Sequence, residues 1–336
     1  MAHAQKELLS GLLKDVSRSF YLTLRLLPGQ VRPQIGLAYL LARTTDTIAD
    51  TELVPLDQRL QSLQDLRARI LGLRQAPLEF GTLARQQASP TERVLLEKCE
   101  ASLSLLQTLE PADRQLVVEV LQTITSGQEL DLRRFGSASA KSVAALRTDD
   151  ELDDYTYRVA GCVGEFWTKI CRAHLFAKAA WDDALLLANG VRFGKGLQLV
   201  NILRDIPADL RRGRCYLPAE RLASLGLQPA DLLEPANELR LRPLYGEYLD
   251  RADAHLLAGW AYTNALPRRC VRLRLACSWP ILIGRETLKL LRTGKVLDPQ
   301  QRIKVSRAQV RRLMLRSVFL YPCLGAWERQ ASAAPG

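Results

Sequence analysis

The sequence predicts an all-α fold, because apolar residues recur mostly three and four positions apart and alternation of β-branched residues is almost absent. No segment repeats with a period of about 20–50 residues, which argues against a solenoid. No long linker divides the chain. With 336 residues, of which 47% are hydrophobic, the chain is long enough to bury a sizeable core. We therefore expect a single helical domain over residues 1–330.

Proline, glycine and capping residues mark the boundaries of the expected helices. Pro28-Gly29 separates a first helix, through SRSFYLTLRLL, from a second that contains GLAYLLARTTDTIADT. Thr148-x-x-Glu151 has the spacing of a capping box and opens the helix DDYTYRVAGCVGEFWTKICRAHLFA. Prolines separate the helical stretches between these two: Pro55, Pro77, Pro90 and Pro111. Later helices are expected through GKGLQLVNILRD, LRPLYGEYLDRADAHLLAGWAYTN, SWPILIGRETLKLLRTG and SRAQVRRLMLRSVFLYPCLGAW.

Composition excludes several classes of protein. The seven cysteines form no CxxC pair, so neither a disulfide framework nor a zinc site is expected, and a reducing cytoplasm fits best. The start, MAHAQKELLSGLLKD, lacks the pattern of a signal peptide, and no uncharged apolar run approaches the roughly 18 residues that span a membrane. Aromatic residues make up only 6% and do not interleave with basic segments, so nucleic acid is not an expected partner.

The net charge of +11 is concentrated in one stretch of the chain. Between Ala261 and Arg316, 14 Lys or Arg residues accompany only Glu286 and Asp298, so this stretch accounts for the whole excess. A basic stretch suits an anionic lipid surface or a phosphorylated ligand, although a solvated helix face explains it equally well. We therefore expect a cytoplasmic protein, with peripheral contact to the inner face of an anionic membrane as a candidate property.

Two pairs of aspartates carry the chemical signal. Asp46 and Asp50 lie four residues apart in RTTDTIADTE, and on a helix they project from one face, where like charges repel. Asp205 and Asp209 repeat this spacing, and Asn201 extends their face by one turn. Carboxylate and amide oxygens suit Mg²⁺, which bridges a few carboxylates to substrate phosphates. A simpler alternative is that Asp50 caps its helix or pairs with a nearby arginine. Both pairs together favour a site for a diphosphate carried by Mg²⁺.

These residues stand in segments that resemble the squalene/phytoene synthase family. DTIAD is similar to the first aspartate-rich motif of the family, and NILRDIPADLRRGRCYLP to the second. SRSF at 17–20 resembles the N-terminal substrate element, and YTYRVAGCVG the central tyrosine-containing segment. The resemblance runs in order from about residue 8 to residue 320. It implies an isoprenoid synthase fold, with helices around a central cavity and the two aspartate motifs facing each other at its mouth.

The resemblance also implies a role for individual residues. The Mg²⁺ ligands would be Asp46, Asp50, Asn201, Asp205 and Asp209. The substrate-binding residues would be Ser17, Arg18, Ser19, Phe20, Tyr39, Arg43, Gln198, Arg204 and Arg214. Tyr155 matches a tyrosine that removes a proton or stabilises a carbocation; a buried tyrosine with a satisfied hydroxyl is the alternative. SGQELDLRRF at 126–135 resembles a further family segment, in which Glu129 and Asp131 are candidates for a supporting role.

The implied reaction is the head-to-head joining of two farnesyl diphosphates, and the favoured product is squalene, formed through a cyclopropyl diphosphate with reduction by NADPH. Lys304 and Arg307 are the candidate NADPH contacts, although both also fit a general basic surface. No GxGxxG follows a strand, so NADPH is implied by the resemblance alone. The alternatives are a non-reducing relative that makes phytoene, dehydrosqualene, presqualene diphosphate or hydroxysqualene, and a non-enzymatic helical protein at a membrane surface.

Two residues depart from the family pattern. Ala49 stands where eukaryotic squalene synthases commonly have a glutamate, so one carboxylate is missing from the first motif. Pro207 falls inside the second motif, where its ring would clash with the carbonyl of Leu203 in a regular helix. A kink at Pro207 would re-aim Asp209.

Overall fold

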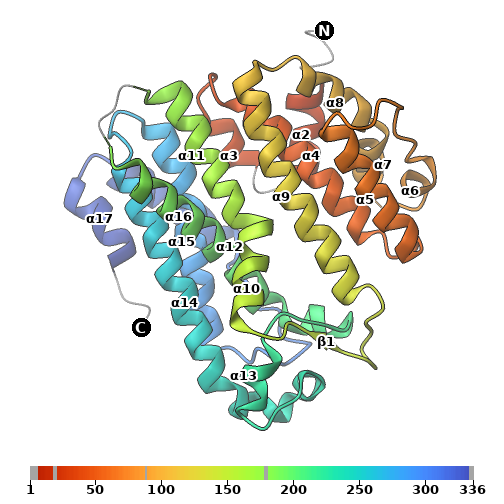
Figure 1. The fold of residues 1–336 in the computed structure, drawn as a ribbon. Helices are drawn as coiled ribbons and strands as arrows, with labels where there is room; N and C mark the ends of the chain where they lie inside the picture. The colour runs from red at the N-terminus through yellow and green to blue at the C-terminus, as the bar shows by residue number, and fades with distance from the viewer. Residues whose placement is uncertain (1–6, 18–20, 88, 178–180, 333–336) are drawn as a thin grey trace. The chain divides into compact units, whose positions relative to one another are not determined.

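The computed structural model describes residues 7–17, 21–87, 89–177 and 181–332 of the chain. It confirms the all-α prediction: helices dominate the described residues, and the strands β1 (Ala144–Ala145) and β2 (Arg214–Cys215) pair in parallel over two residues each. The chain divides into two compact units, residues 1–136 with 166–180 and residues 137–165 with 181–336. Figure 1 labels the elements of both.

The first unit is built around α4 (Arg32–Asp50), which packs against α5 (Leu56–Ile70), α8 (Cys99–Gln107) and α9 (Pro111–Phe135). Buried leucines on one stripe of α4 make this core, among them Leu37, Leu40 and Leu41, each 0% exposed. The other elements are η1 (Glu7–Leu12, a π-helical turn), α2 (Leu13–Ser17), α3 (Tyr21–Leu26), α6 (Gly81–Arg85) and α7 (Pro90–Glu97).

The second unit is built around α12 (Asp183–Arg211), α14 (Glu238–Ala265) and α15 (Val271–Thr293), which pack against one another and lie side by side in Figure 1. Its shorter elements are α10 (Asp149–Thr156), η3 (Tyr157–Gly161, a π-helical turn), α13 (Ala219–Ala223), η4 (Pro229–Leu233), η5 (Pro235–Asn237), α16 (Arg307–Leu320) and α17 (Leu324–Ser332). The remaining helix, α11 (Cys162–Leu175), follows η3 directly.

Glycines allow α12 to approach the η3–α11 segment at backbone distance. A Cβ placed on Gly164 would lie 1.9 Å from the carbonyl oxygen of Gly190, and one on Gly194 would lie 2.1 Å from that of Ala160. No side chain fits at either position. The sequence left open whether Gly161 and Gly164 serve helix packing or make room for a prenyl chain, and the Gly164 contact shows that close packing requires at least this glycine.

Two expected elements differ in detail. Thr148 caps α10 as predicted, its Oγ1 accepting from the Glu151 amide at 3.2 Å, but the Glu151 carboxylate accepts from the amide of Arg147 at 2.8 Å instead of closing the box on Thr148. The helix that was expected through SRAQVRRLMLRSVFLYPCLGAW is two helices, because Pro322 falls between α16 and α17 and cannot continue the first.

The last helix, α17, is anchored by buried groups. Trp327 is 1% exposed, stacks on Trp260 with ring centroids 5.1 Å apart, and donates from its indole N–H to Oδ1 of Asn264 at 2.7 Å. The buried Arg285, paired with Asp253 at 2.6 Å, also donates to the carbonyl of Ala331. Anchoring of this kind holds a terminal helix that would otherwise fray.

Candidate active site

The first aspartate pair lies at the end of α4, one helical turn apart. The two threonines before Asp46 are buried within the helix, and their hydroxyls donate to the carbonyls of Leu40 and Ala42 at 2.9 and 2.7 Å. This bonding lets polar residues face the core without unsatisfied groups. Asp46 is half-buried and Asp50 is exposed, so neither carboxylate is enclosed in the core.

The carboxyl of Asp46 lies in a setting that favours its protonated form. Burial, together with the nearby Asp50 carboxylate, raises the pKa of Asp46 to about 7, and Arg43 opposes the rise. Nη1 of Arg43 lies 3.7 Å from Asp46, while Nη2 lies 2.5 Å from Oε1 of Glu92, so this arginine is shared between two acids. Gln128 on α9 donates to Asp46 at 2.5 Å. An excess of negative charge at this turn is the setting in which a bound cation is stabilising.

The second aspartate pair, with Asn201, forms what we call the second acidic face, residues Asn201, Asp205 and Asp209 of α12. Asn201 is exposed and the two aspartates are half-buried. Arg204 forms a bidentate pair with Asp205, with N···O distances of 2.9 and 2.5 Å. The apolar residues between them, Ile202, Leu203 and Ile206, are buried.

Helix α12 does not end at Pro207. Helical structure continues from Asp183 through Pro207 to Arg211. Pro207 leaves the carbonyl of Leu203 without its usual donor, and this carbonyl oxygen accepts a hydrogen bond from the hydroxyl of Tyr245 at 3.1 Å. Asp209 therefore stays on the same helix as Asn201 and Asp205.

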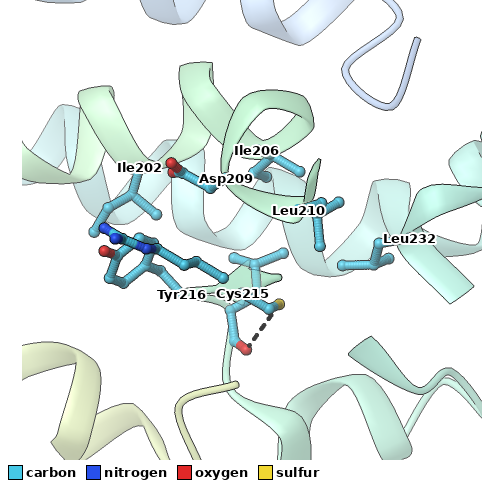
Figure 2. A pocket seen from close by; sticks show the side chains of 9 residues that line it. Ile202, Ile206, Asp209, Leu210, Cys215, Tyr216 and Leu232 are labelled. Atoms are coloured by element: carbon cyan, nitrogen blue, oxygen red, sulfur yellow. Dashed lines mark hydrogen bonds between the residues drawn. The ribbon is translucent and has the colours of Figure 1, made fainter. Parts of the chain in front are cut away.

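A small pocket lies beside the end of α12 (Figure 2), and Asp209 and Arg214 both line it. Its wall also includes Tyr216, which is 8% exposed. Figure 2 shows Asp209 and Tyr216 towards one end and Leu210 and Leu232 towards the other. The pocket thus has a polar end, formed by the second motif, and an apolar end.

Tyr155 contacts Tyr216, one of the residues that line this pocket. Its ring stacks on Tyr216 with centroids 4.8 Å apart and an interplanar angle of 25°, and its exposed fraction is 7%. The structure therefore brings the predicted central tyrosine next to a residue of the second motif. Tyr216 stands in the YLP that follows the motif, so the sequence offered a signal for it, although its stacking partner could not be read from spacing.

The other predicted residues are spread over both units. Tyr39 is half-buried on α4, and Gln198 half-buried on α12. Ser17 is buried, and its hydroxyl donates to the carbonyl of Leu13. Three predicted substrate contacts, Arg18, Ser19 and Phe20, lie outside the described residues. Lys304 and Arg307, the predicted NADPH contacts, are both exposed, just before and at the first residue of α16.

Sequence reasoning missed several polar partners of the site. In SGQELDLRRF, it is Gln128 that reaches Asp46, while Glu129 lies 3.8 Å from Arg67. Lys195 pairs with Asp153 at 2.6 Å and places its ammonium 5.8 Å from the centre of the Tyr157 ring. Gln128 lies one position before Glu129, the residue that the sequence analysis named as a candidate. Neighbouring residues on a helix point in different directions, and here Gln128 is the one that points at α4.

Comparison with known proteins places these motifs in a family. The squalene/phytoene synthase family matches residues 13–309, which contain both aspartate pairs and the central tyrosine segment. The chain belongs to the squalene/phytoene synthase family. It is accordingly an enzyme of the prenyltransferase type.

Relatives within the squalene/phytoene synthase family differ in product. A presqualene diphosphate synthase of Rhodopseudomonas palustris is 30% identical over 303 residues, covering 89% of this chain and 92% of that protein. A 15-cis-phytoene synthase of Synechocystis is 30% identical over 242 residues, covering 70% of this chain and 62% of that protein, less than two thirds of its length. The solved structure of TcSQS with a bound ligand matches with a TM-score of 0.74 at 20% identity, over 99% of this chain and 98% of that one. This likeness confirms the isoprenoid synthase fold.

Members of the squalene/phytoene synthase family depend on Mg²⁺, and the donor atoms of this chain fit that ion. Each aspartate pair supplies hard carboxylate oxygens one turn apart, and the raised pKa of Asp46 marks a place where a divalent cation would offset repulsion. No group of three or more His, Cys, Asp or Glu side chains able to hold a metal occurs among the described residues. The metal assignment proposed below therefore rests on pairs of carboxylates.

Proposed function

We propose that this enzyme joins two molecules of farnesyl diphosphate head to head, with the cyclopropyl presqualene diphosphate as the first product. The observation that carries the proposal is the pair of acidic faces: α4 presents Asp46 and Asp50 one turn apart, and α12 presents Asp205 and Asp209 in the same way. The presqualene diphosphate synthase of R. palustris, which aligns over 89% of this chain, supports the choice of substrate.

The proposed Mg²⁺ ligands are those of the two acidic faces. They are Asp46, Asp50, Asn201, Asp205 and Asp209. Bound Mg²⁺ would act as a Lewis acid that neutralises the charge growing on a departing diphosphate. Arg204 and Arg214 are proposed to bind phosphate oxygens, because a guanidinium offers planar, often bidentate, contacts to them. Arg204 would then exchange Asp205 for phosphate, or bind both.

The proposed chemistry requires one C–O bond to break and two C–C bonds to form. The allylic C1–O bond of one farnesyl diphosphate breaks, and its electrons leave with the diphosphate. The double bond of the second molecule attacks the resulting cation, and loss of a proton closes the cyclopropane. Tyr155 is proposed to stabilise the cation with its π face or to accept the proton, since a phenol can do either. An apolar lining around the substrate would keep water from the cation.

A second candidate step is the reduction of presqualene diphosphate by NADPH. Its product would be squalene, which the resemblance in sequence favours. Its support is the exposed pair Lys304 and Arg307, two cations three residues apart that could contact a phosphate. Phytoene and dehydrosqualene are the corresponding products of related non-reducing enzymes. The three outcomes differ in chain length and redox state, so product analysis separates them.

The test is incubation of purified protein with farnesyl diphosphate and Mg²⁺, with and without NADPH, followed by mass spectrometry of the extracted products. Presqualene diphosphate in both tubes supports the first step, and squalene only with NADPH supports the second. Turnover of geranylgeranyl diphosphate but not of farnesyl diphosphate would overturn the substrate assignment.

Variants of the acidic faces separate an enzyme site from a merely structural one. Asp46→Asn and Asp205→Asn should each lower the turnover number by about a hundredfold or more while the protein stays folded by circular dichroism. Glu97→Gln is the matched control, since Glu97 is an exposed carboxylate on α7 that pairs with its helical neighbour Arg93, at 2.9 Å. Unchanged turnover in both aspartate variants would contradict the metal-ligand assignment.

We also propose that α16 rests on an anionic bilayer. Arg311, Arg312 and Arg316 are exposed on this helix, and so are Leu315 and Phe319, at 60% and 77%. Cations interleaved with exposed apolar side chains are the pattern of an interfacial helix. No helix among the described residues has the length and apolarity needed to cross a membrane.

Co-sedimentation with lipid vesicles tests this contact. Binding is expected to vesicles of phosphatidylcholine with phosphatidylglycerol, to weaken in 0.5 M salt, and to be lost in Arg312→Glu/Phe319→Asp. Arg93→Glu, which changes a surface arginine of α7, is the control that should keep binding. Equal binding to neutral vesicles would show that charge plays no part.

A further inference from the structure

Pro207 removes one backbone hydrogen bond from the middle of the second acidic face. Proline has no N–H, and within a helix its ring crowds the carbonyl four residues earlier, which here belongs to Leu203. Leu203 is 1% exposed, so water cannot replace the missing donor. A buried carbonyl without a donor is destabilising, and it would lie between Asn201 and Asp205, the first two residues of this face.

Tyr245 supplies the donor. Its hydroxyl donates to the carbonyl oxygen of Leu203 at 3.1 Å, from α14, which packs against α12. Tyr245 is 0% exposed, and burial raises the pKa of its phenol well above the usual value, so the hydroxyl keeps the proton that it donates.

The ring of Tyr245 is itself fixed by neighbouring groups. The guanidinium of Arg242 lies 5.7 Å from the ring centre. Arg242 in turn donates to the carbonyls of Leu291 and Arg292, both at 3.1 Å, near the end of α15. The hydroxyl therefore has a position set by α14 and α15, and it can hold α12 from outside the helix.

We propose that Tyr245 is a positioning residue for the second acidic face: its hydroxyl replaces the amide that Pro207 lacks and keeps Asn201, Asp205 and Asp209 in one helical register. This inference rests on the proposed function, in which that face binds Mg²⁺ and diphosphate. Tyr245 acts through the backbone of Leu203 and contacts neither ligand.

The test is a four-protein cycle of the wild type, Tyr245→Phe, Pro207→Ala and the double variant. An alanine at 207 restores an N–H that can bond the carbonyl of Leu203, so the phenol becomes redundant. Tyr245→Phe should lower the melting temperature by about 2–5 °C when residue 207 is proline and by less than about 1 °C when it is alanine.

A second readout follows the acidic face without any turnover. Mg²⁺ with inorganic pyrophosphate should raise the melting temperature of the wild type, since a ligand that binds only the folded state stabilises it. Tyr245→Phe should need about ten times more Mg²⁺ than the wild type to reach the same rise, and the double variant should need the same concentration as the wild type.

Tyr248→Phe is the matched control, because Tyr248 is a buried tyrosine on the same helix whose hydroxyl donates to Asp149 at 2.9 Å instead of to α12. Its loss of stability should be equal in the two backgrounds. An equal loss for Tyr245→Phe in both backgrounds overturns the proposal, as does an unchanged Mg²⁺ requirement. If Tyr245→Phe alone does not fold, recovery of folded protein in the double variant supports the coupling, and no recovery overturns it.

The two proposals fail in different ways. Absence of any prenyl product from the wild type overturns the proposed function, whereas the thermal cycle still measures the coupling between Tyr245 and Pro207. If the wild type turns over farnesyl diphosphate but the effects of Tyr245→Phe and Pro207→Ala on melting temperature are additive, only the positioning role is overturned.

Discussion

At the scale of single residues, Asp46 shows how a functional carboxylate can oppose stability. Its pKa is raised to about 7 by burial and by Asp50, so the folded protein holds this proton over a range in which the unfolded chain has released it. The contribution of Asp46 to stability therefore falls as the pH rises from about 4 to about 7, and its full unfavourable effect is present above that range. Such strain is typical of groups selected for binding a cation.

Asp46→Asn should remove this pH dependence. In the presence of EDTA, the variant should melt at a higher temperature than the wild type at pH 8, with a smaller difference at pH 5, because only at the higher pH does the wild type carry the repelling charge. Thermal denaturation of both proteins at the two pH values measures this. A gain of the same size at pH 5 and pH 8 would show that charge at Asp46 is not the cause.

At the scale of elements, the packing of α12 depends on positions that accept no side chain. The carbonyl of Gly190 occupies the place where a Cβ of residue 164 would stand, 1.9 Å away. Backbone on both sides of this contact leaves nothing flexible to move aside. A helix pair of this kind is fixed in its spacing by residues that add nothing to the hydrophobic core.

Gly164→Ala should therefore destabilise the protein by about 1–3 kcal/mol or more, despite the better helix propensity of alanine. Gly246→Ala is the matched control, because a Cβ at Gly246 of α14 meets nothing within 4 Å. Urea denaturation should give a lower midpoint for the first variant and an equal or higher midpoint for the second. Equal midpoints would mean that the helices separate at little cost.

The N-terminus of α10 offers a smaller effect at the same scale. Thr148→Ala removes the side-chain acceptor of the Glu151 amide and should destabilise by about 1 kcal/mol, while Thr148→Ser should retain most of the stability. The difference between the two variants in urea denaturation isolates the cap. Both variants lose the γ-methyl group of threonine, and only the alanine variant also loses the hydroxyl. A serine variant as unstable as the alanine variant would assign the loss to the methyl group instead.

At the scale of the whole molecule, the cysteines behave as buried apolar side chains. All seven are free, and five of them are buried, with Cys270 half-buried and Cys323 exposed. We expect one thiol to react rapidly with a disulfide reagent in the folded protein, and the buried ones only on unfolding. Cys323→Ser should abolish the rapid phase. A rapid phase that persists in this variant would identify another thiol as accessible.

The sequence predicted the helices and the acidic faces well, because apolar periodicity and i, i+4 spacing are local properties. The helix limits at Pro28-Gly29 and the cap at Thr148 follow from the same local chemistry. Tertiary partners could not be predicted: the hydroxyl that donates to the carbonyl of Leu203 comes from Tyr245, 42 positions later. Likewise, Gln128 on α9 donates to Asp46, and no spacing rule joins these two residues.

The anchoring of α17 gives the protein an optical reporter of its own. Stacked indoles couple their electronic transitions, and the rings of Trp260 and Trp327 lie 5.1 Å apart at an angle of 24°. This pair should give an aromatic circular dichroism band that a single indole lacks. Release of the last helix would extinguish the band while the peptide signal stayed nearly constant, so partial opening at this end can be followed without a label.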